Sequence, residues 1–400
     1  MAGPLDGVRV LDLTTVVLGP YCTQIMADMG ADVIKVEGPD GDSTRYLGAG
    51  RRPGMSGIFI NLNRGKRSLV LDLKAPEGRA ALLAVARRCD VFVHSMRARA
   101  IERLGLAYET LAGAAPSIVY CSVTGYGKRG RYRDKPAYDD VIQAGCGLVF
   151  LQAELAGKPQ YVTTVVADKV TGLMALSGIL MALFHRSRTG KGQAVEVPMF
   201  ETMASFVLAE NICGQAFDPP LGPAIYRRLT AAARKPYRTL DGYLSVIVYT
   251  DRQWKRFLDV AERADLADDP RLASFAARTG HVDFAYGLIE SIIATRTSAQ
   301  WIALLEDADI PVMPVLSTDQ LFSDPHLAEA RMIGAIATEG DGKLRLPRTP
   351  VEFSETPARC LTAAPELGQH TRAILFEAGY AAADVDALVT RIARSAPPAA

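Results

Sequence analysis

The sequence predicts an α/β protein that has a large domain with a mostly parallel sheet and a smaller α+β domain. Three observations support this prediction. Short apolar segments alternate with helical segments along the first half of the chain, which is typical of parallel sheets. From about residue 230 the alternation gives way to several consecutive helices with a strand on either side. The length of 400 residues is sufficient for two or three domains.

The chain opens with a strand–helix–strand unit. Residues 8–13 form an apolar-rich strand, and a helix begins at Gly19-Pro20, where proline needs no N–H donor. Apolar residues follow at helical spacing, and Gly30 is a favoured helix terminator. Residues 31–37 form the second strand. Two strands joined in this way normally pair in parallel with a right-handed crossover.

The same alternation continues to residue 197 and then changes. Further strands are expected at 68–73, 91–94, 117–123 and 193–197, with helices at 75–89 and 98–103. The second half predicts strands at 243–249 and 312–316 and helices at 252–263, 281–294 and 298–307. Thr297 and Gln300 form a capping-box pattern at the start of the last helix.

Composition excludes several classes of protein. Lys+Arg of 45 against Asp+Glu of 44 leaves a net charge of +1, which argues against a nucleic-acid binder. The longest apolar stretch, Val170–Phe184, is interrupted by Thr171 and Ser177 and is too short to span a bilayer. The N-terminus lacks the features of a signal peptide, and the six cysteines show no C-x-x-C spacing. We expect a cytoplasmic protein without a membrane, nucleic-acid or metal partner.

A G-x-G-x-x-G sequence at Gly125–Gly130 follows a predicted strand. In a dinucleotide site this loop must open a helix, whereas residues 131–136 are charged and interrupted by a proline. A glycine-rich surface loop is therefore favoured, and a dinucleotide-dependent oxidoreductase is a remote alternative. The basic stretches 64–67, 97–103 and 128–133 are either solvated surface or a converging site for a polyanion such as a nucleotide phosphate.

Asp168 directly precedes a helix expected to begin near Lys169. Aspartate is a preferred helix cap, and the helix macrodipole favours its ionised form. With Gly172 and Gly178 adding little bulk nearby, the same carboxylate is also a ready nucleophile that can attack an acyl centre and form a mixed anhydride. Spacing alone leaves both roles open.

Ordered motifs run through nearly the whole chain, and with them it resembles the class III coenzyme A transferases, a group that includes formyl-CoA transferase and carnitine CoA-transferase. The motifs are Pro4–Leu13, Gly19-Pro20, Gly30–Glu37, Asn63–Leu69, Leu71–Lys74, Pro76–Gly78, Glu102–Leu106, Thr124–Gly127, Thr189–Gln193, Pro236–Thr239, Asp241–Tyr243 and Leu367–Thr371.

The resemblance implies a Rossmann-like large domain, formed by both ends of the chain, and a smaller domain. It also implies that two ring-like subunits interlock in a homodimer. The corresponding limits are 1–200 for the first part of the large CoA-binding domain, 201–225 for a linker, 226–320 for the small domain, 321–345 for a return linker and 346–400 for the part that completes the large domain.

The resemblance also implies the site. The family's nucleophilic aspartate falls on Asp168, and CoA or acyl-CoA enters as a substrate, with no permanently bound cofactor. Lys74, Arg97 and Arg103 suit contacts to phosphate. The CoA-contacting positions are Val16, Val17, Leu18, Leu71, Lys74, Met96, Arg97, Arg103, Lys135 and Tyr138.

The expected reaction moves CoA from an acyl-CoA thioester to a carboxylic acid through an aspartyl anhydride and an aspartyl-CoA thioester. Succinyl-CoA and a small dicarboxylate are the expected pair, because several cations near the first loops could bind carboxylates. These cations are Arg45, Arg51, Arg52, Lys66 and Arg67.

Departures from the family pattern argue against some of the activities found in related enzymes. The formyl-transferring branch has a glutamine where Val17 stands and a glycine-rich lid that is missing between residues 215 and 240, which argues against formate and oxalate. The related α-methylacyl-CoA racemases use a histidine in a Gly-His-Asp segment, and Ala137-Tyr138-Asp139 lacks it. The common Asn-Phe-Arg-Pro-Gly turn is replaced by residues 95–99. A racemase and a non-catalytic acyl-CoA-binding protein remain as alternatives.

Overall fold

The computed structural model describes residues 3–358 and 362–395, which pack as two compact units. The first unit comprises Met1–Cys146, Val162–Phe206 and His326–Ala400, and the second comprises Gly147–Tyr161 and Val207–Pro325. This division differs from the predicted domain limits at residues 147–161, because helix α7 (Leu148–Ala156) packs against the 3-10 turn η3 (Arg227–Thr230).

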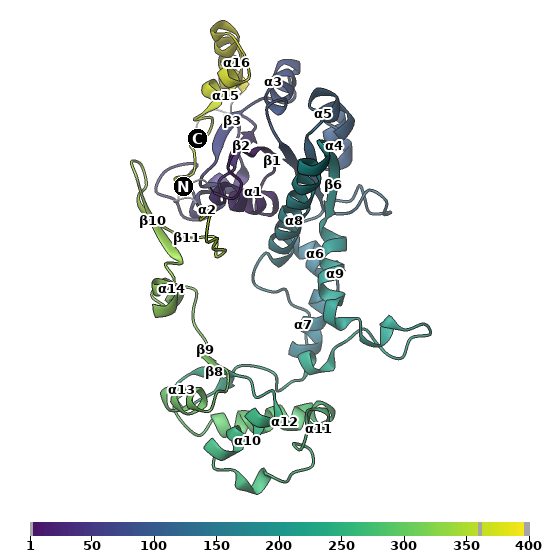
Figure 1. The fold of residues 1–400 in the computed structure, drawn as a ribbon, viewed down its shortest axis with the longest axis vertical. Helices are drawn as coiled ribbons and strands as arrows, with labels where there is room; N and C mark the ends of the chain where they lie inside the picture. Colours follow the sequence, from purple (N-terminus) through teal and green to yellow (C-terminus); the bar gives the residue numbers. More distant parts are fainter. Residues whose placement is uncertain (1–2, 359–361, 396–400) are drawn as a thin grey trace. The chain divides into compact units, whose positions relative to one another are not determined.

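The first unit is built on a six-stranded parallel sheet with the strand order β3-β2-β1-β4-β5-β6. Figure 1 labels β1, β2, β3 and β6 of this sheet. Every strand predicted in the first 200 residues is present, although β3 ends at Val70 rather than at residue 73. The order reverses between β1 and β4, and such a switch point opens a crevice at the carboxyl ends of the strands. The strands are β1 (Arg9–Leu13), β2 (Asp32–Glu37), β3 (Arg67–Val70), β4 (Val91–His94), β5 (Val119–Thr124) and β6 (Gln193–Pro198).

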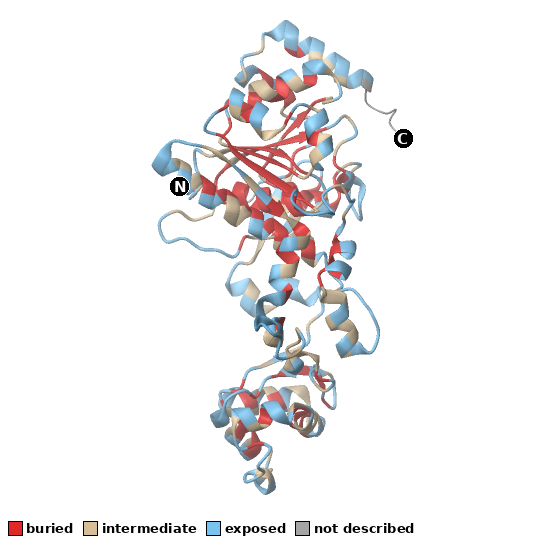
Figure 2. Cartoon of the chain, turned by 90° about the vertical axis from the view of Figure 1, so that its right-hand side faces the viewer, coloured by how far each residue is buried: buried red, intermediate tan, exposed pale blue. Residues whose placement is uncertain are grey.

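Side chains alternate along each strand, so the two faces of the sheet pack against different elements. Leu11 and Leu13 of β1 belong to a large apolar core together with residues of α3, α5, α15 and α16. Asp12, which points to the opposite face, accepts a hydrogen bond from Thr23 of α1. Both faces are covered, and the strands accordingly have the burial colour of core residues in Figure 2.

Helices and one hairpin complete this unit. At the C-terminal end, His370 donates its backbone N–H to Ser68 O, and the Thr371 hydroxyl accepts from Val70 N, so the return segment joins the edge of β3. The predicted return linker at 321–345 contains helix α14, strand β10 and part of β11, which pair as an antiparallel hairpin. The elements are α1 (Leu18–Asp28), η1 (Ser43–Tyr46), α2 (Gly57–Asn63), α3 (Pro76–Ala86), α4 (Ala98–Arg103), α5 (Tyr108–Ala114), α6 (Asp139–Gly145), α8 (Val166–Thr189), α9 (Met199–Asn211, in this unit up to Phe206), α14 (Pro325–Glu329), β10 (Ile333–Thr338), β11 (Gly342–Pro347), α15 (Thr371–Glu377) and α16 (Ala382–Ser395).

Helix α8 corrects one expectation. The apolar stretch that seemed too short for a bilayer lies in a helix of 24 residues, which by length and composition alone could cross a membrane. Its small residues Ala167, Thr171 and Ala175 form a buried stripe, and the helix packs against α1, β5 and β6. This packing is that of a helix on the face of a sheet.

The second unit is an α+β structure around a small antiparallel sheet with the order β7-β8-β9. The predicted capping box is confirmed: the Thr297 side chain accepts from Gln300 N, and the Gln300 side chain accepts from Thr297 N. Trp301 is buried in the core of the unit and donates its indole N–H to Ile293 O at 2.8 Å. The remaining elements are η2 (Cys213–Ala216), β7 (Tyr237–Arg238), β8 (Tyr243–Val246), α10 (Asp251–Val260), η4 (Ala264–Leu266), α11 (Phe275–Gly280), α12 (Val282–Ile293), α13 (Ser298–Asp307), β9 (Val312–Pro314) and η5 (Gln320–Phe322).

Candidate active site

A cavity of about 860 Å³ lies in the first unit where the parallel strands end. Its walls are the segments that follow the carboxyl ends of β1 to β5, so the switch in strand order opens it. Ten of the eleven predicted site residues line this cavity: Val16, Val17, Leu18, Leu71, Lys74, Met96, Arg97, Lys135, Tyr138 and Asp168.

Arg103 is the predicted residue that lies elsewhere. It lines a neighbouring cavity of about 640 Å³ together with Arg97 and Arg99. Because Arg97 and Ala100 line both cavities, the two spaces adjoin. The adjoining cavity also contains two carboxylates, and Asp134 forms an ion pair with Arg99 at 2.9 Å.

Asp168 is the third residue of α8, and Val165 is the N-cap. The expectation that Asp168 caps its own helix is therefore wrong. The cap comes from α6 instead, because the backbone N–H of Asp168 donates to Asp139 Oδ1 at 3.0 Å. No hydrogen bond to the Asp168 carboxylate itself is found within the described part of the chain, and Asp168 lines the cavity.

The expectation that Asp168 is readily ionised is also corrected. Burial raises the pKa of Asp168 to about 7, and the negative charge of Asp139 adds to the increase. These two effects outweigh the favourable position in the first turn of a helix. A carboxyl group with a pKa near 7 is a stronger nucleophile, once ionised, than an ordinary aspartate, and perturbed groups of this kind gather at functional sites.

Gln143 ties the segment before α8 to α6. Its side chain is buried, and its Oε1 accepts from Val162 N at 3.0 Å while its Nε2 donates to Thr164 O at 3.3 Å. The same Nε2 donates to Asp139 Oδ2 at 2.5 Å. Asp139 and Gln143, one turn apart on α6, thus hold both the approach to α8 and its first turn.

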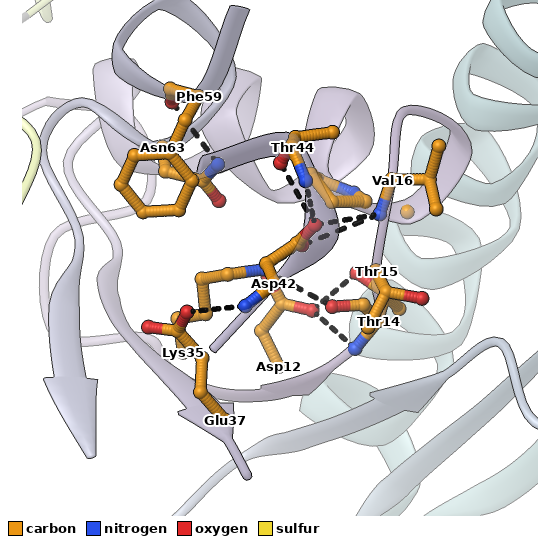
Figure 3. Close-up of polar contacts among 12 residues, drawn as sticks. Asp12, Thr14, Thr15, Val16, Lys35, Glu37, Asp42, Thr44, Phe59 and Asn63 are labelled. Atoms are coloured by element: carbon orange, nitrogen blue, oxygen red, sulfur yellow. Dashed lines mark hydrogen bonds and ion pairs between the residues drawn. The ribbon is translucent and has the colours of Figure 1, made fainter. Parts of the chain in front are cut away.

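The turn between β1 and α1 forms another wall of the cavity and rests on buried charges (Figure 3). Asp12 and Lys35 are direct neighbours across β1 and β2 and are both fully buried. Asp12 accepts from Thr14 N at 2.9 Å, and Lys35 Nζ donates to Thr14 O at 3.1 Å. Thr15 N donates to Ser95 Oγ at 3.3 Å, which links this turn to the one after β4.

A buried histidine supports the turn that carries Met96 and Arg97. His94 Nδ1 accepts from Met96 N at 3.2 Å, so the neutral ring carries its proton on Nε2 and donates to Tyr120 Oη at 2.9 Å. The Tyr120 hydroxyl donates in turn to Leu106 O. Burial lowers the pKa of His94 to about 4, and the Lys128 charge adds to this effect, so the ring is neutral near pH 7.

The glycine-rich loop at Gly125–Gly130 does not open a helix. Gly127 N donates to Glu201 Oε1 at 3.0 Å, and Lys128 N donates to Glu196 Oε1 at 2.7 Å. The backbone N–H groups that a dinucleotide site would direct at the pyrophosphate thus already donate hydrogen bonds to carboxylates of the protein. This supports the interpretation of the motif as a surface loop.

The five cations expected to bind a substrate carboxylate all have structural partners, and none of the five lines the cavity. Arg45 and Lys66 are buried in ion pairs with Glu37 and Asp12. The other three cations link segments that are distant in the sequence, because they form hydrogen bonds or ion pairs with carbonyl and carboxylate groups of those segments. Arg51 donates to Asp341 O, Arg52 pairs with Asp341 and Glu366, and Arg67 pairs with Asp32 and Glu377.

Comparison with known proteins agrees with this geometry. The model of CoA-transferase family III matches residues 5–371. The chain belongs to CoA-transferase family III. The succinate–glutarate CoA-transferase of Agrobacterium fabrum is 35% identical over 94% of this chain and 95% of its own length. The succinyl-CoA:mesaconate CoA-transferase of Haloarcula hispanica is 34% identical over 94% of this chain and 97% of its own length. A crystal structure of a CaiB/BaiF family protein from Brucella suis superposes with a TM-score of 0.79 and 31% identity, covering 94% of this chain and 100% of that one.

The predicted resemblance is thus confirmed, and this member of CoA-transferase family III is a transferase. Sequence reasoning missed the contacts of Asp139, Gln143 and His94 in this CoA-transferase. Asp139 was noticed only as the neighbour of a missing histidine. The i, i+4 spacing of Asp139 and Gln143 was a usable signal for a pair on one helix face.

Proposed function

We propose that this CoA-transferase moves CoA from succinyl-CoA to a small dicarboxylic acid, with Asp168 as the nucleophile. The observation that carries the proposal is Asp168, whose carboxyl group has a raised pKa and which lines the same cavity as nine of the ten predicted CoA-contacting residues. The relatives named for succinate–glutarate and succinyl-CoA:mesaconate transfer support the choice of substrates.

The reaction proceeds in four exchanges at acyl carbons. The Asp168 carboxylate attacks the thioester carbonyl, the C–S bond breaks, and an aspartyl-succinyl anhydride and CoA thiolate result. The thiolate attacks the aspartyl carbonyl and releases succinate, which leaves an aspartyl-CoA thioester. The acceptor carboxylate attacks this thioester, and CoA thiolate leaves as a second anhydride forms. The thiolate then attacks the acceptor carbonyl and regenerates Asp168.

Exposed cations along the cavity suit the phosphates of CoA, which enters as a substrate and not as a permanent cofactor. Lys74, Arg97 and Lys135 line the main cavity, and Arg103 lines the adjoining one. None of these four cations has a carboxylate partner among the ion pairs of the described residues, unlike Arg45, Arg52, Lys66 and Arg67. They are therefore available to an anionic ligand.

Transfer is favoured over racemisation. A racemase needs two bases on opposite sides of an acyl α-carbon, and no histidine is found among the described residues that line the cavity. Asp139 is engaged by Gln143 and by the Asp168 amide. Asp168 has no such partner for its carboxylate among the described residues, and it is the group that we propose reacts with an acyl centre.

We also propose that the large domain is Rossmann-like and that the protein forms a homodimer. The strand order is that of doubly wound dinucleotide-binding sheets. Met174, Met181 and Phe184 of α8 are at least half exposed, and a second copy of the chain is the occupant that we propose for this apolar face. Met181→Glu is expected to shift the mass measured by light scattering from dimer to monomer. We also propose a cytoplasmic location, in line with the absence of C-x-x-C spacing among the six cysteines of the sequence.

Mass spectrometry of the intact protein tests the mechanism. After mixing with succinyl-CoA, the wild-type enzyme is expected to gain a CoA adduct that hydroxylamine removes and that maps to Asp168. Asp168→Asn is the control, because it preserves the shape of the side chain and should bind CoA without forming the adduct. Transfer by Asp168→Asn at the wild-type rate would exclude the mechanism. Deuterium exchange at the acyl α-carbon without transfer would indicate a racemase instead.

A further inference from the structure

Val16 has an unusual backbone conformation at the wall of the cavity. Its φ angle is +68°, in the left-handed region. Among the described residues, five other than glycine have a positive φ, and Val16 is the β-branched one. A β-branched side chain is strained in this region, so the surrounding structure must impose the conformation.

Asp42 supplies the contacts that hold Val16. Val16 N donates to both carboxylate oxygens of Asp42, at 3.3 and 3.4 Å (Figure 3). The Asp42 carboxylate is itself fixed, because it accepts from Lys35 Nζ at 2.8 Å and from the backbone N–H and hydroxyl of Thr44 at 2.9 and 2.8 Å. Burial alone would raise the pKa of Asp42, but the charge of Lys35 and the Thr44 donors hold it below its ordinary value. Asp42 is thus an immobile anion beneath the turn.

The position of Val16 determines where the next residues lie. Helix α1 begins at Leu18, and Val17 O accepts its first helical hydrogen bond from Tyr21 N at 2.8 Å. A Cβ atom added to Gly172 of α8 would lie 2.6 Å from Leu18 O, so the backbones of α1 and α8 approach each other closely at this point. Gly172 is one helical turn after Asp168. A change in the φ angle of Val16 would therefore move Val17 and Leu18 relative to the nucleophile that we propose.

We propose that Asp42 is a positioning residue of the active site: its buried carboxylate holds Val16 in the left-handed conformation and so fixes Val17 and Leu18 against the helix that carries Asp168. The inference rests on the proposed function for its kinetic consequence. The proposed role of Asp42 differs from general stabilisation, because it depends on the strained φ angle of Val16 and not only on the ion pair between Asp42 and Lys35.

A double-mutant cycle separates positioning from general stability. Asp42→Asn is expected to lower kcat/KM for transfer at least tenfold and to weaken CoA binding measured by calorimetry. Glycine adopts a positive φ without strain, so Asp42→Asn in the Val16→Gly background is expected to cost less than threefold relative to Val16→Gly alone. A purely structural role for Asp42 predicts the same loss in both backgrounds, and that result would overturn the proposal.

Asp28→Asn is the matched control. Asp28 is also a buried aspartate, paired with Arg64 at 2.8 Å, but it does not line the cavity. It is expected to lower the melting temperature while leaving kcat/KM of the folded enzyme unchanged. If Asp42→Asn does not fold, Thr44→Val removes one donor to the same carboxylate, and the same comparison of backgrounds decides the question. If the wild-type enzyme binds CoA but transfers nothing, the proposed function is wrong. The same double-mutant cycle, measured by CoA affinity in place of kcat/KM, would then decide the role of Asp42.

Discussion

The backbone N–H of Asp168 donates to the carboxylate of Asp139, so one aspartate caps α8 while the other lines the cavity. This relationship divides two tasks that sequence reasoning assigned to a single residue. Because Asp139 satisfies the helix terminus, the Asp168 carboxylate needs no role in capping. The proximity of the two carboxylates also raises the pKa of Asp168.

The pH dependence of transfer follows from this pair. The nucleophile must be ionised, and the pKa of Asp168 is about 7, so kcat/KM is expected to rise with pH and to level off above about pH 8. At pH 6 it should be about one tenth of the plateau, since about one tenth of the carboxyl groups are then ionised. Asp139→Asn removes a negative charge and should move the midpoint to lower pH. A midpoint near pH 4 in the wild-type enzyme would contradict the assignment.

The same pKa has a consequence for stability. The pKa of Asp168 is about 7 in the folded protein against an ordinary value of 3.8, so its contribution to folding is fully present below about pH 4 and is lost as the pH rises through 7. Asp168→Asn should therefore melt at a higher temperature than the wild type at pH 8, because the variant has no carboxyl group that must ionise in a buried position. Calorimetry at pH 8 and pH 4 checks this, and the difference should shrink at the lower pH.

Gln143→Ala tests the support of the segment before α8. Loss of the Gln143 contacts to Val162 and Thr164 frees the approach to Asp168, so kcat should fall about 10- to 100-fold while KM for the acyl-CoA changes little. Gln24→Ala is the matched control, because Gln24 is also buried and donates to Asp28 four residues away at 2.6 Å. Equal losses of kcat in the two variants would show that Gln143 has no special role.

His94→Leu tests the support of the Met96–Arg97 turn. Without an acceptor for Met96 N, the turn should loosen, and KM for the acyl-CoA is expected to rise about 5- to 20-fold with a smaller change in kcat. His94→Asn places an acceptor where Nδ1 lies and should recover most of the affinity. Because the pKa of His94 is about 4, neither substitution should alter the pH profile above pH 6. A shifted profile would assign His94 a titrating role instead.

Local chemistry made much of the fold predictable. The strand from 91 to 94, the helix from 298 to 307 and its capping box at Thr297 all agree with the structure, because apolar periodicity and caps act within a few residues. The end of β3 was predicted three residues too late, since pairing with β2 and not propensity decides where a strand stops. Ten of the eleven residues that the family resemblance implies line one cavity.

The sequence by itself determined the class of sheet and the family, because these depend on residue types at fixed spacing, and the family resemblance then indicated Asp168 as the candidate nucleophile. Tertiary structure alone decided which charges are free. Arg45 and Lys66 looked like substrate ligands but lie in buried ion pairs, and Asp168 looked like an ionised cap but has a pKa of about 7. The physical reason is that burial and the partners of a charge come from segments distant along the chain, as with Asp139 and Asp168, and they fix both its pKa and its availability.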